Sequence, residues 1–493
     1  MKKYNINTLL SILLTSVIML TSCSDFLDTN PTDRLPADKV KTLKDAEKIV
    51  DGFYFTMKWN NYYGTPLMLL GETRGDDLRP RRESGGYQQI YNYEFTPSNY
   101  SYGDIWATAY NVIMNVNVFL NNWESIEATS DEEIAKKNDC KGQALAVRAF
   151  CHFDIARVYG YPYQKNNGTS LGAVKGNKVF TVGEQAERIS VAETYNFIIN
   201  DLTEALTLLS TDRKHGNLDY WGAKGLLARV YLYKGDYDNA FKHADEILTD
   251  ATNPYSLVTN AQYIDSWEQP NSSETMLELL TSAFSHIDDN GGVDSWYYIL
   301  WHGEGFSSGN LVPTDSWLAL LDEDPDDVRH GLVKQGTDAG VNFRWLAKFR
   351  GNNGDGDFKI NNPMIMRLSE IYLIAAESAL MKSSPDQNKA DFYLNEIRKR
   401  ANPAAVQITA TVDEVLKERR KEFIGEGHRY YDSGRLGLTI NRNTPDNKLP
   451  ADSKYKIVDP WNAEGNQYQV ILPIPQSQRT ANPAAFQNPG YPD

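Results

Sequence analysis

The sequence predicts a mainly α-helical fold, in which tetratricopeptide-like helix pairs form a right-handed solenoid scaffold that carries long loop-rich insertions. Two observations lead to this prediction. Apolar residues recur at helical spacing in several segments. Two stretches, near 190–250 and 364–400, each have the pattern of two helices joined by a short turn. Outside these stretches, about 60–101 and 251–362 are rich in Gly, Pro, Asn and Tyr, which is typical of loops.

The amino terminus has the pattern of a bacterial lipoprotein signal. Lys2 and Lys3 precede an apolar run over 9–20 that is too short to span a bilayer comfortably. Small residues then lead to Cys23, as in a lipobox, so Cys23 is expected to become acylated after cleavage. The expected division is a signal peptide over 1–22, a lipid-anchored tether over 23–36 and a single domain over 37–493.

Side chains that cap helices mark the expected helix starts. Asp104 is a predicted N-cap for the amphipathic segment 104–123. Two capping boxes precede further helices, of which the second is expected to end near Gly425. The boxes are Ser190 with Glu193, and Thr411 with Glu414. The segment 143–159 is apolar on nearly every side, so we expect it to lie between other helices and to end at Gly160.

The clearest helix pair lies within 221–240, where small residues allow two helices to approach closely. Gly235 and Asp236 supply the turn between them. A second pair is predicted from 368–380 and 390–400. Because such pairs stack on their neighbours, they form a rigid base, and the long loops are the expected place for function.

Charge and cysteine content exclude some functions. The formal net charge is -15, and phosphate binding needs clustered Lys and Arg, so nucleic acid is not an expected partner. If Cys140 and Cys151 lie on one helix, about 16 Å separates them, which is beyond the reach of a disulfide. We therefore expect neither a disulfide nor a metal site built from cysteines.

Six blocks, taken in order along the mature chain, resemble the SusD/RagB family. They are 26–28 with Pro31, 148–160, 228–237, 367–377, 418–432, and 472–475 with 487–491. The resemblance implies a SusD-like helical fold and a surface-exposed, lipid-anchored place at the outer membrane. It also implies a non-catalytic nutrient-binding role as a lid over a SusC-like TonB-dependent transporter. The charged run 418–422 is expected to be scaffold, either ion-paired or solvated.

Sugar recognition needs aromatic faces for the C–H side of the ring and fixed polar groups for the hydroxyls. The stretch 71–100 offers both, so we predict ligand contacts there. The candidates are Arg74, Asp76, Asp77, Arg81, Tyr87, Tyr91 and Tyr93. The alternative is a charged loop whose tyrosines pack on the helices below.

A second predicted ligand-binding stretch is 284–310, where aromatic residues stand among glycines. The candidates are Trp296, Tyr298 and Trp301. In a strand, Trp296 and Tyr298 would share one face. Arg350 is a further candidate, as a bidentate donor to hydroxyls or a carboxylate. Together these residues favour an oligosaccharide or polysaccharide as the ligand.

Two other functions stay open beside glycan binding. The helix pairs also fit a peptide-binding member of the same family. A surface glycoside hydrolase would need only two carboxylates, such as Asp76 or Asp77 with Glu304. No cofactor is expected, although a structural calcium ion could be bound within 352–357 or 322–327.

Overall fold

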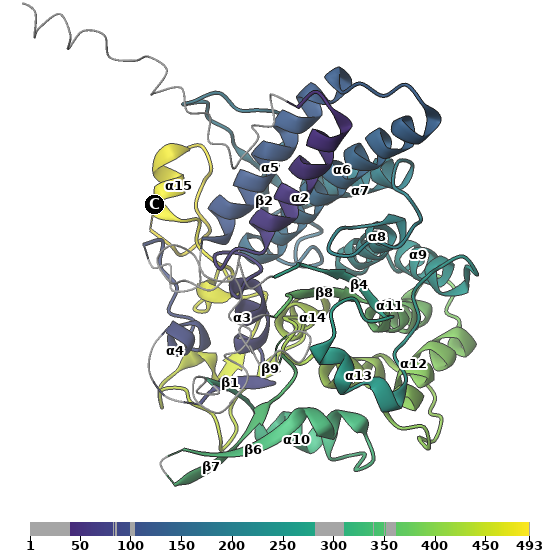
Figure 1. The fold of residues 1–493 in the computed structure, drawn as a ribbon. Coiled ribbons are helices and arrows are strands. Elements are labelled where there is room, and N and C mark those ends of the chain that lie inside the picture. The colour runs from purple at the N-terminus through teal and green to yellow at the C-terminus, as the bar shows by residue number, and fades with distance from the viewer. Residues whose placement is uncertain are drawn as a thin grey trace, which may run out of the picture.

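Helices make up about half of the described chain, and short two-stranded ladders join them (Figure 1). The computed structural model describes residues 40–81, 83, 86–98, 104–281, 310–338, 340–349, 351 and 361–492. One cluster of buried apolar side chains extends from Val40 to Tyr491. Within these residues, no helix combines the length and apolar character needed to cross a membrane. The predicted mainly α fold is confirmed.

Four helices of the first half of the chain pack against one another as a bundle. They are α2 (Leu43–Met57), α5 (Ile105–Asn122), α6 (Asp131–Tyr159) and α7 (Val191–Leu206). Figure 1 shows α2, α5 and α6 running alongside each other at the top of the view. The predicted caps are confirmed. Asp104 accepts a hydrogen bond from the Ala107 N–H, and Ser190 with Glu193 forms a reciprocal box.

Helix α6 is longer than the sequence indicated. The predicted segment 143–159 is buried and ends at Gly160, as expected, but the helix already begins at Asp131. Its first turns are polar and exposed, so they carry no apolar period that would predict a helix. A box of Ser130 and Glu133 starts it instead.

Replacing Ser130 with Ala is expected to lower the free energy of unfolding by about 1 kcal/mol, because the Glu133 N–H loses its acceptor. Urea denaturation followed by far-ultraviolet circular dichroism measures the change. Thr203→Ala, at an exposed position inside α7, is the control and should leave stability unchanged or slightly raised. Equal stability of Ser130→Ala and the wild type would contradict the prediction.

Both predicted helix pairs are confirmed. Helices α8 (Tyr220–Lys234) and α9 (Tyr237–Thr249) form the first pair, and α11 (Leu368–Met381) and α12 (Gln387–Ala401) form the second. Gly235 makes the first turn with a φ of 77°, which a residue with a side chain rarely adopts. Because α9 also packs on α11, the two pairs stack into one block.

Helices α13 (Val412–Phe423) and α14 (Arg429–Leu436) follow the second pair. Thr411 accepts a hydrogen bond from the Glu414 N–H, as predicted, and α13 ends at Phe423, close to the expected Gly425. Helix α13 packs on α11, and α14 packs on α3 (Pro66–Thr73). These contacts join the start of the chain to its last third.

The described strands form two-stranded antiparallel ladders. The ladders are β1 (Leu78–Pro80) with β5 (Leu311–Pro313), β2 (Leu171–Val174) with β3 (Arg188–Ser190), β4 (Thr275–Glu278) with β8 (Met364–Arg367), β6 (Val333–Asp338) with β7 (Val341–Leu346), and β9 (Ile440–Asn441) with β10 (Ile457–Val458). In two of them, β1 with β5 and β4 with β8, the strands lie far apart in sequence, so these ladders bring distant segments together.

The expectation of a loop over about 60–101 is wrong in part. This stretch contains α3, β1 and α4 (Gly86–Tyr91), and every residue of α3 is buried. Pro66 begins α3 at a position where a missing N–H costs nothing. The predicted loop over 251–362 likewise contains α10 (Asp315–Leu321) and four strands. The 3₁₀-helices among the described residues are Trp123–Ser125, Asn260–Gln262, Asp265–Glu268, Val328–Leu332, Lys454–Lys456 and Tyr468–Val470.

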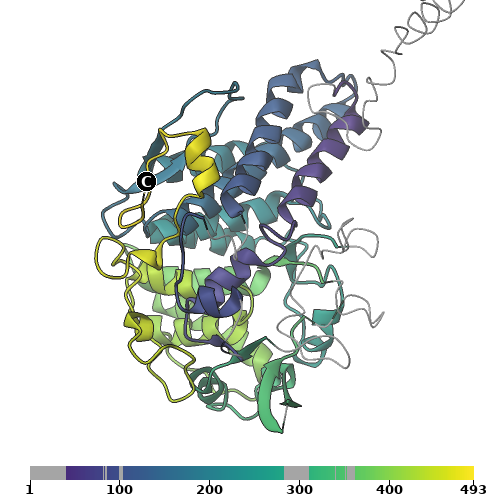
Figure 2. The same cartoon turned by 90° about the vertical axis from the view of Figure 1, so that its left-hand side faces the viewer.

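The C-terminal segment returns to the first bundle, where α15 (Gln476–Ala481) lies beside it (Figure 2). The Asn482 side chain both donates to and accepts from the backbone of Ala186. Asn488 donates to the carbonyl of Tyr159 at 2.8 Å, and its oxygen accepts from Arg188 at 2.7 Å. The tail block therefore fastens the end of α6.

Candidate functional site

The predicted ligand-binding stretch begins where α3, β1 and α4 lie against α14 and β9 (Figure 1). Arg74, the first candidate, is fully buried. Its guanidinium donates to the carbonyls of Leu70 and Val470 at 2.8 and 3.0 Å, and it lies 3.9 Å from the centre of the Tyr430 ring. Through these contacts Arg74 joins α3 to α14. The prediction that Arg74 contacts a ligand is therefore wrong.

Tyr91 and Tyr93 were predicted as sugar platforms, and the structure buries both of them. The Arg442 guanidinium lies 3.7 Å from the centre of the Tyr91 ring. Tyr93 stacks on Tyr455 with ring centres 4.3 Å apart, and its hydroxyl donates to the carbonyl of Arg74. Their aromatic faces are covered by the protein itself, which is the alternative that the sequence left open.

Asp76 and Asp77 attach β1 to α13 and α14. Asp76 Oδ1 lies 2.5 Å from Arg429 Nε, and Asp77 Oδ1 lies 2.5 Å from Arg420 Nη2. Burial raises the pKa of both carboxyls and the arginine charges lower it. The net pKa is lowered at Asp76 and raised at Asp77, which also lies beside the Asp76 charge. Asp77 is buried, so the prediction that it contacts a ligand is also wrong. The Asp76 side chain is only slightly exposed.

The predicted residues that remain at the surface lie at the end of β1 and in α4. Arg81 and Tyr87 are half-buried, and the Arg81 guanidinium lies 4.6 Å from the centre of the Phe343 ring on β7. The Arg81 N–H donates to the carbonyl of Asn310 at 2.9 Å, and the Tyr87 side chain is paired with Asn310 as well. Burial raises the pKa of the Tyr87 hydroxyl, so it stays neutral. We call Arg81, Tyr87 and Phe343 the rim.

Phe343 was not predicted, although a signal for it exists in the sequence. Val341, Phe343 and Trp345 alternate with polar residues, which is typical of a strand with one apolar face. This strand is β7, and the left-handed φ of 81° at Gly340 forms the turn that returns it to β6. The alternation would have placed Phe343 and Trp345 together on the face that meets Arg81.

The remaining candidates, Trp296, Tyr298, Trp301 and Arg350, lie outside the described residues, as do Glu304 and Cys23. The residues that flank the aromatic candidates and Arg350 are described. The Thr281 N–H donates to the Asn362 side chain, and the Gly351 N–H donates to the Asn361 side chain, both at 2.8 Å. Together with the bond from Arg81 to Asn310, these anchors connect both stretches to β1 and β8.

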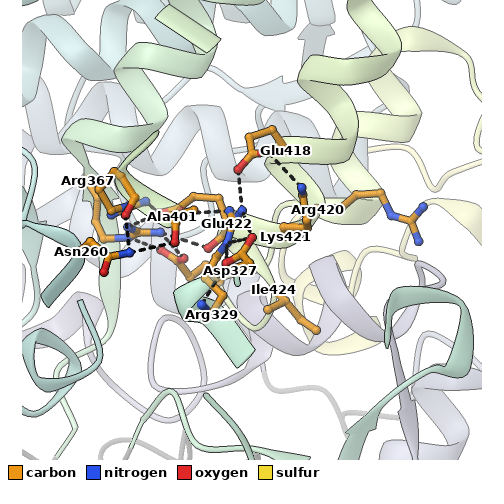
Figure 3. A network of polar contacts seen from close by, with 12 residues as sticks. Asn260, Asp327, Arg329, Arg367, Ala401, Glu418, Arg420, Lys421, Glu422 and Ile424 are labelled. Carbon is orange, nitrogen blue, oxygen red and sulfur yellow. Dashed lines mark hydrogen bonds and ion pairs between the residues drawn. The ribbon is translucent and has the colours of Figure 1, made fainter. Parts of the chain in front are cut away.

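A large network of buried ion pairs lies beneath this region, where α11, α12 and α13 meet (Figure 3). Glu422 is its centre and lies 2.7 Å from Arg367, 2.6 Å from Arg400 and 3.2 Å from Arg329. Burial would raise the Glu422 pKa, but the arginines lower it well below its ordinary value. The run 418–422 is therefore ion-paired scaffold, which is one of its two expected roles.

The described residues offer polar and aromatic groups for a ligand at the rim and no evident metal site. No group of three or more His, Cys, Asp or Glu side chains among them is placed to hold a metal ion. This covers the stretch 322–327 that the sequence suggested for calcium, whereas 352–357 lies outside the described residues. Arg81 beside an aromatic ring can donate to hydroxyls in a fixed direction.

Two protein-family models match the chain. The one described as "SusD family" matches residues 333–491, and the one described as "Starch-binding associating with outer membrane" matches residues 25–232. A solved structure of a SusD superfamily protein from Bacteroides vulgatus is 35% identical with a TM-score of 0.83. The match covers 92% of this chain and 100% of that one.

Two further proteins have names that state a ligand. The starch-binding protein SusD of Bacteroides thetaiotaomicron is 34% identical over 128 residues, which is 26% of this chain and 21% of that protein. Surface glycan-binding protein A of the same species, solved in complex with laminarihexaose, is 20% identical with a TM-score of 0.71. It matches 91% of this chain and 99% of its own, and this likeness concerns the fold alone.

Proposed function

Because this chain belongs to the SusD family, we propose that it is a cell-surface glycan-binding protein without catalytic activity. It captures an oligosaccharide or polysaccharide and delivers it to a SusC-like TonB-dependent transporter of the outer membrane. The observation that carries the proposal is the match of residues 25–232 to starch-binding proteins that associate with the outer membrane. The name of the starch-binding relative supports the same ligand class.

The proposed attachment to the membrane is through acyl chains on Cys23. The matched region begins at residue 25, two positions after this cysteine, and the described fold begins at Val40. The residues between them are long enough to act as a tether. Acyl chains supply about 0.8 kcal/mol per buried methylene, which attaches a protein to a leaflet without a spanning helix.

The rim is the described part of the proposed glycan site. Phe343 and Tyr87 supply ring surface, and the Arg81 guanidinium supplies donors for sugar hydroxyls. Trp296, Tyr298, Trp301 and Arg350 remain proposed contacts from the sequence, because their flanking residues are anchored next to β1 and β8. Rigid strands and buried ion pairs fix the position of the rim before ligand arrives, which lowers the entropy cost of binding.

Asp76 and Asp77, each considered as the partner of Glu304 in a glycoside hydrolase, lie in surroundings that do not suit catalysis. A hydrolase needs an acid with a raised pKa that can reach the substrate. Asp76 has a lowered pKa because Arg429 neutralises it, and Asp77 is covered by protein. Each carboxylate is already ion-paired to an arginine of α13 or α14.

Replacing Arg81 with Ala is expected to weaken glycan binding about tenfold, because a charged hydrogen-bond donor contributes roughly 1.5 kcal/mol or more. Isothermal titration of the soluble form, residues 24–493, measures the change. The matched control is Arg344→Ala, an exposed arginine of β7 one residue after Phe343 and therefore on the opposite face of the strand. If Arg81→Ala binds as tightly as Arg344→Ala, the rim is not the site.

A further inference from the structure

A surface hollow of about 410 Å³ lies along the outer side of α12, away from the rim. One wall is a single face of α12, to which Asn388, Phe392 and Lys399 contribute, and the other wall is the segment 407–409. This volume falls within the range of roughly 300–1,000 Å³ that is usual for small-molecule sites. In Figure 1, α12 lies at the right edge of the molecule and α4 at the left edge, so the two regions are well separated.

The walls of the hollow are fastened to each other by part-buried hydrogen bonds. Asn395 is 4% exposed, and its amide donates to the carbonyl of Ile408 at 2.8 Å while accepting from the Ile408 N–H at 3.0 Å. The carboxylate of Asp391 accepts from the Ala410 N–H at 2.6 Å. The segment beside α12 is thus fixed to the helix, and the hollow is formed before any ligand binds.

Phe392 gives the hollow an aromatic wall. Its side chain is 54% exposed, although a ring of this size is normally buried. It packs edge-on against Tyr393, with ring centres 5.3 Å apart, so the ring is supported at a fixed angle. An exposed, supported aromatic ring beside polar groups is the arrangement that covers the C–H face of a sugar.

The polar groups around Phe392 are mostly neutral and available. Within the described chain, the side chains of Asn388, Gln407 and Thr409 make no hydrogen bond or ion pair, and all three line the hollow. Lys399 lies 3.7 Å from Glu396, so its charge is balanced locally. Amides and a hydroxyl can both donate and accept, as sugar hydroxyls do. A neutral ligand fits this lining, and the chain's net charge of -15 disfavours an acidic one.

We propose that this hollow is a second carbohydrate-binding site, which takes a short stretch of neutral glycan with one ring against Phe392. The choice of ligand class rests on the proposed glycan-binding function. Two sites at opposite edges of the protein can hold one polysaccharide at two points. Because the second contact is then intramolecular, a long glycan binds more tightly than a short one that fills a single site.

The test uses hydrogen exchange and titration on residues 24–493 with four neutral hexasaccharides: maltohexaose, laminarihexaose, cellohexaose and xylohexaose. With the hexasaccharide that binds, slower exchange is expected in two regions, 78–93 and 387–410. Phe392→Ala should lose the protection at 387–410, keep it at 78–93, and reduce the stoichiometry from about two to about one. Phe486→Ala, which removes a comparably exposed ring elsewhere, is the matched control and should keep both.

The outcomes separate this site from the proposed function. Protection at 78–93 alone, with an unchanged Phe392→Ala variant, overturns the second site and leaves glycan binding intact. Protection at 387–410 alone supports the second site and removes the rim assignment. If none of the four hexasaccharides is bound anywhere, the second site for a short neutral glycan fails, whereas the glycan-binding function is tested separately by titration against polysaccharides.

Discussion

Glu422→Gln is expected to lower the free energy of unfolding by about 3–5 kcal/mol, because it breaks the centre of the buried ion-pair network. Glu422 is fully buried, and its two oxygens are shared by Arg367, Arg400 and Arg329. The amide of Gln carries no charge and points N–H donors at the N–H donors of guanidinium groups. Chemical denaturation at pH 7 measures the loss.

The control is Glu414→Gln on the same helix, where the side chain is half-buried and ion-paired with Lys417. Its effect should stay below about 0.5 kcal/mol. The folded pKa of Glu422 lies below its ordinary value of 4.5, so its contribution is complete above that pH and is lost as the pH falls. The difference in free energy of unfolding between wild type and Glu422→Gln should therefore become smaller at acidic pH. Equal stability of the two Gln variants at pH 7 would contradict this account.

Glu72→Gln should have the opposite effect and stabilise the protein by a few kcal/mol at pH 8. Burial raises the pKa of Glu72 to about 8, and the charge of Asp77 adds to the rise. The folded state thus holds a proton that the unfolded state has released above about pH 4.5, so wild-type stability falls as the pH rises toward 8. Gln supplies an N–H in place of that proton, and its oxygen still accepts from the Gly427 N–H.

The measurement is the free energy of unfolding of both proteins at several pH values between 5 and 8.5. The difference between them should be small at pH 5 and should grow steadily in favour of Glu72→Gln. Taking the difference removes the contributions of other shifted groups that do not interact with Glu72. A difference that does not change with pH would show that Glu72 is ionised in the folded protein.

Local features of the sequence predicted the helical scaffold well. Asp104, Ser190 and Thr411 cap helices as expected, because a cap involves residues only three positions apart. The helix pair around Gly235 follows from a turn that requires a left-handed φ. Such signals need no knowledge of the rest of the chain.

The candidate site was harder to predict, because the partners of its residues are distant in sequence. Asp76 pairs with a residue 353 positions later, and the backbone of Tyr91 accepts a hydrogen bond from Arg442, 351 positions later. No local pattern distinguishes a tyrosine that stacks on a buried arginine from one that faces a sugar. The buried candidates Arg74 and Tyr93 were misassigned for the same reason.

The most direct test of glycan capture is titration of residues 24–493 against plant, host and microbial polysaccharides, with released reducing ends assayed in the same samples. The account predicts that at least one polysaccharide binds and that no reducing ends appear. Release of reducing ends would contradict the prediction that the protein has no catalytic activity. If peptides bind and no polysaccharide binds, the prediction that the ligand is a glycan is wrong.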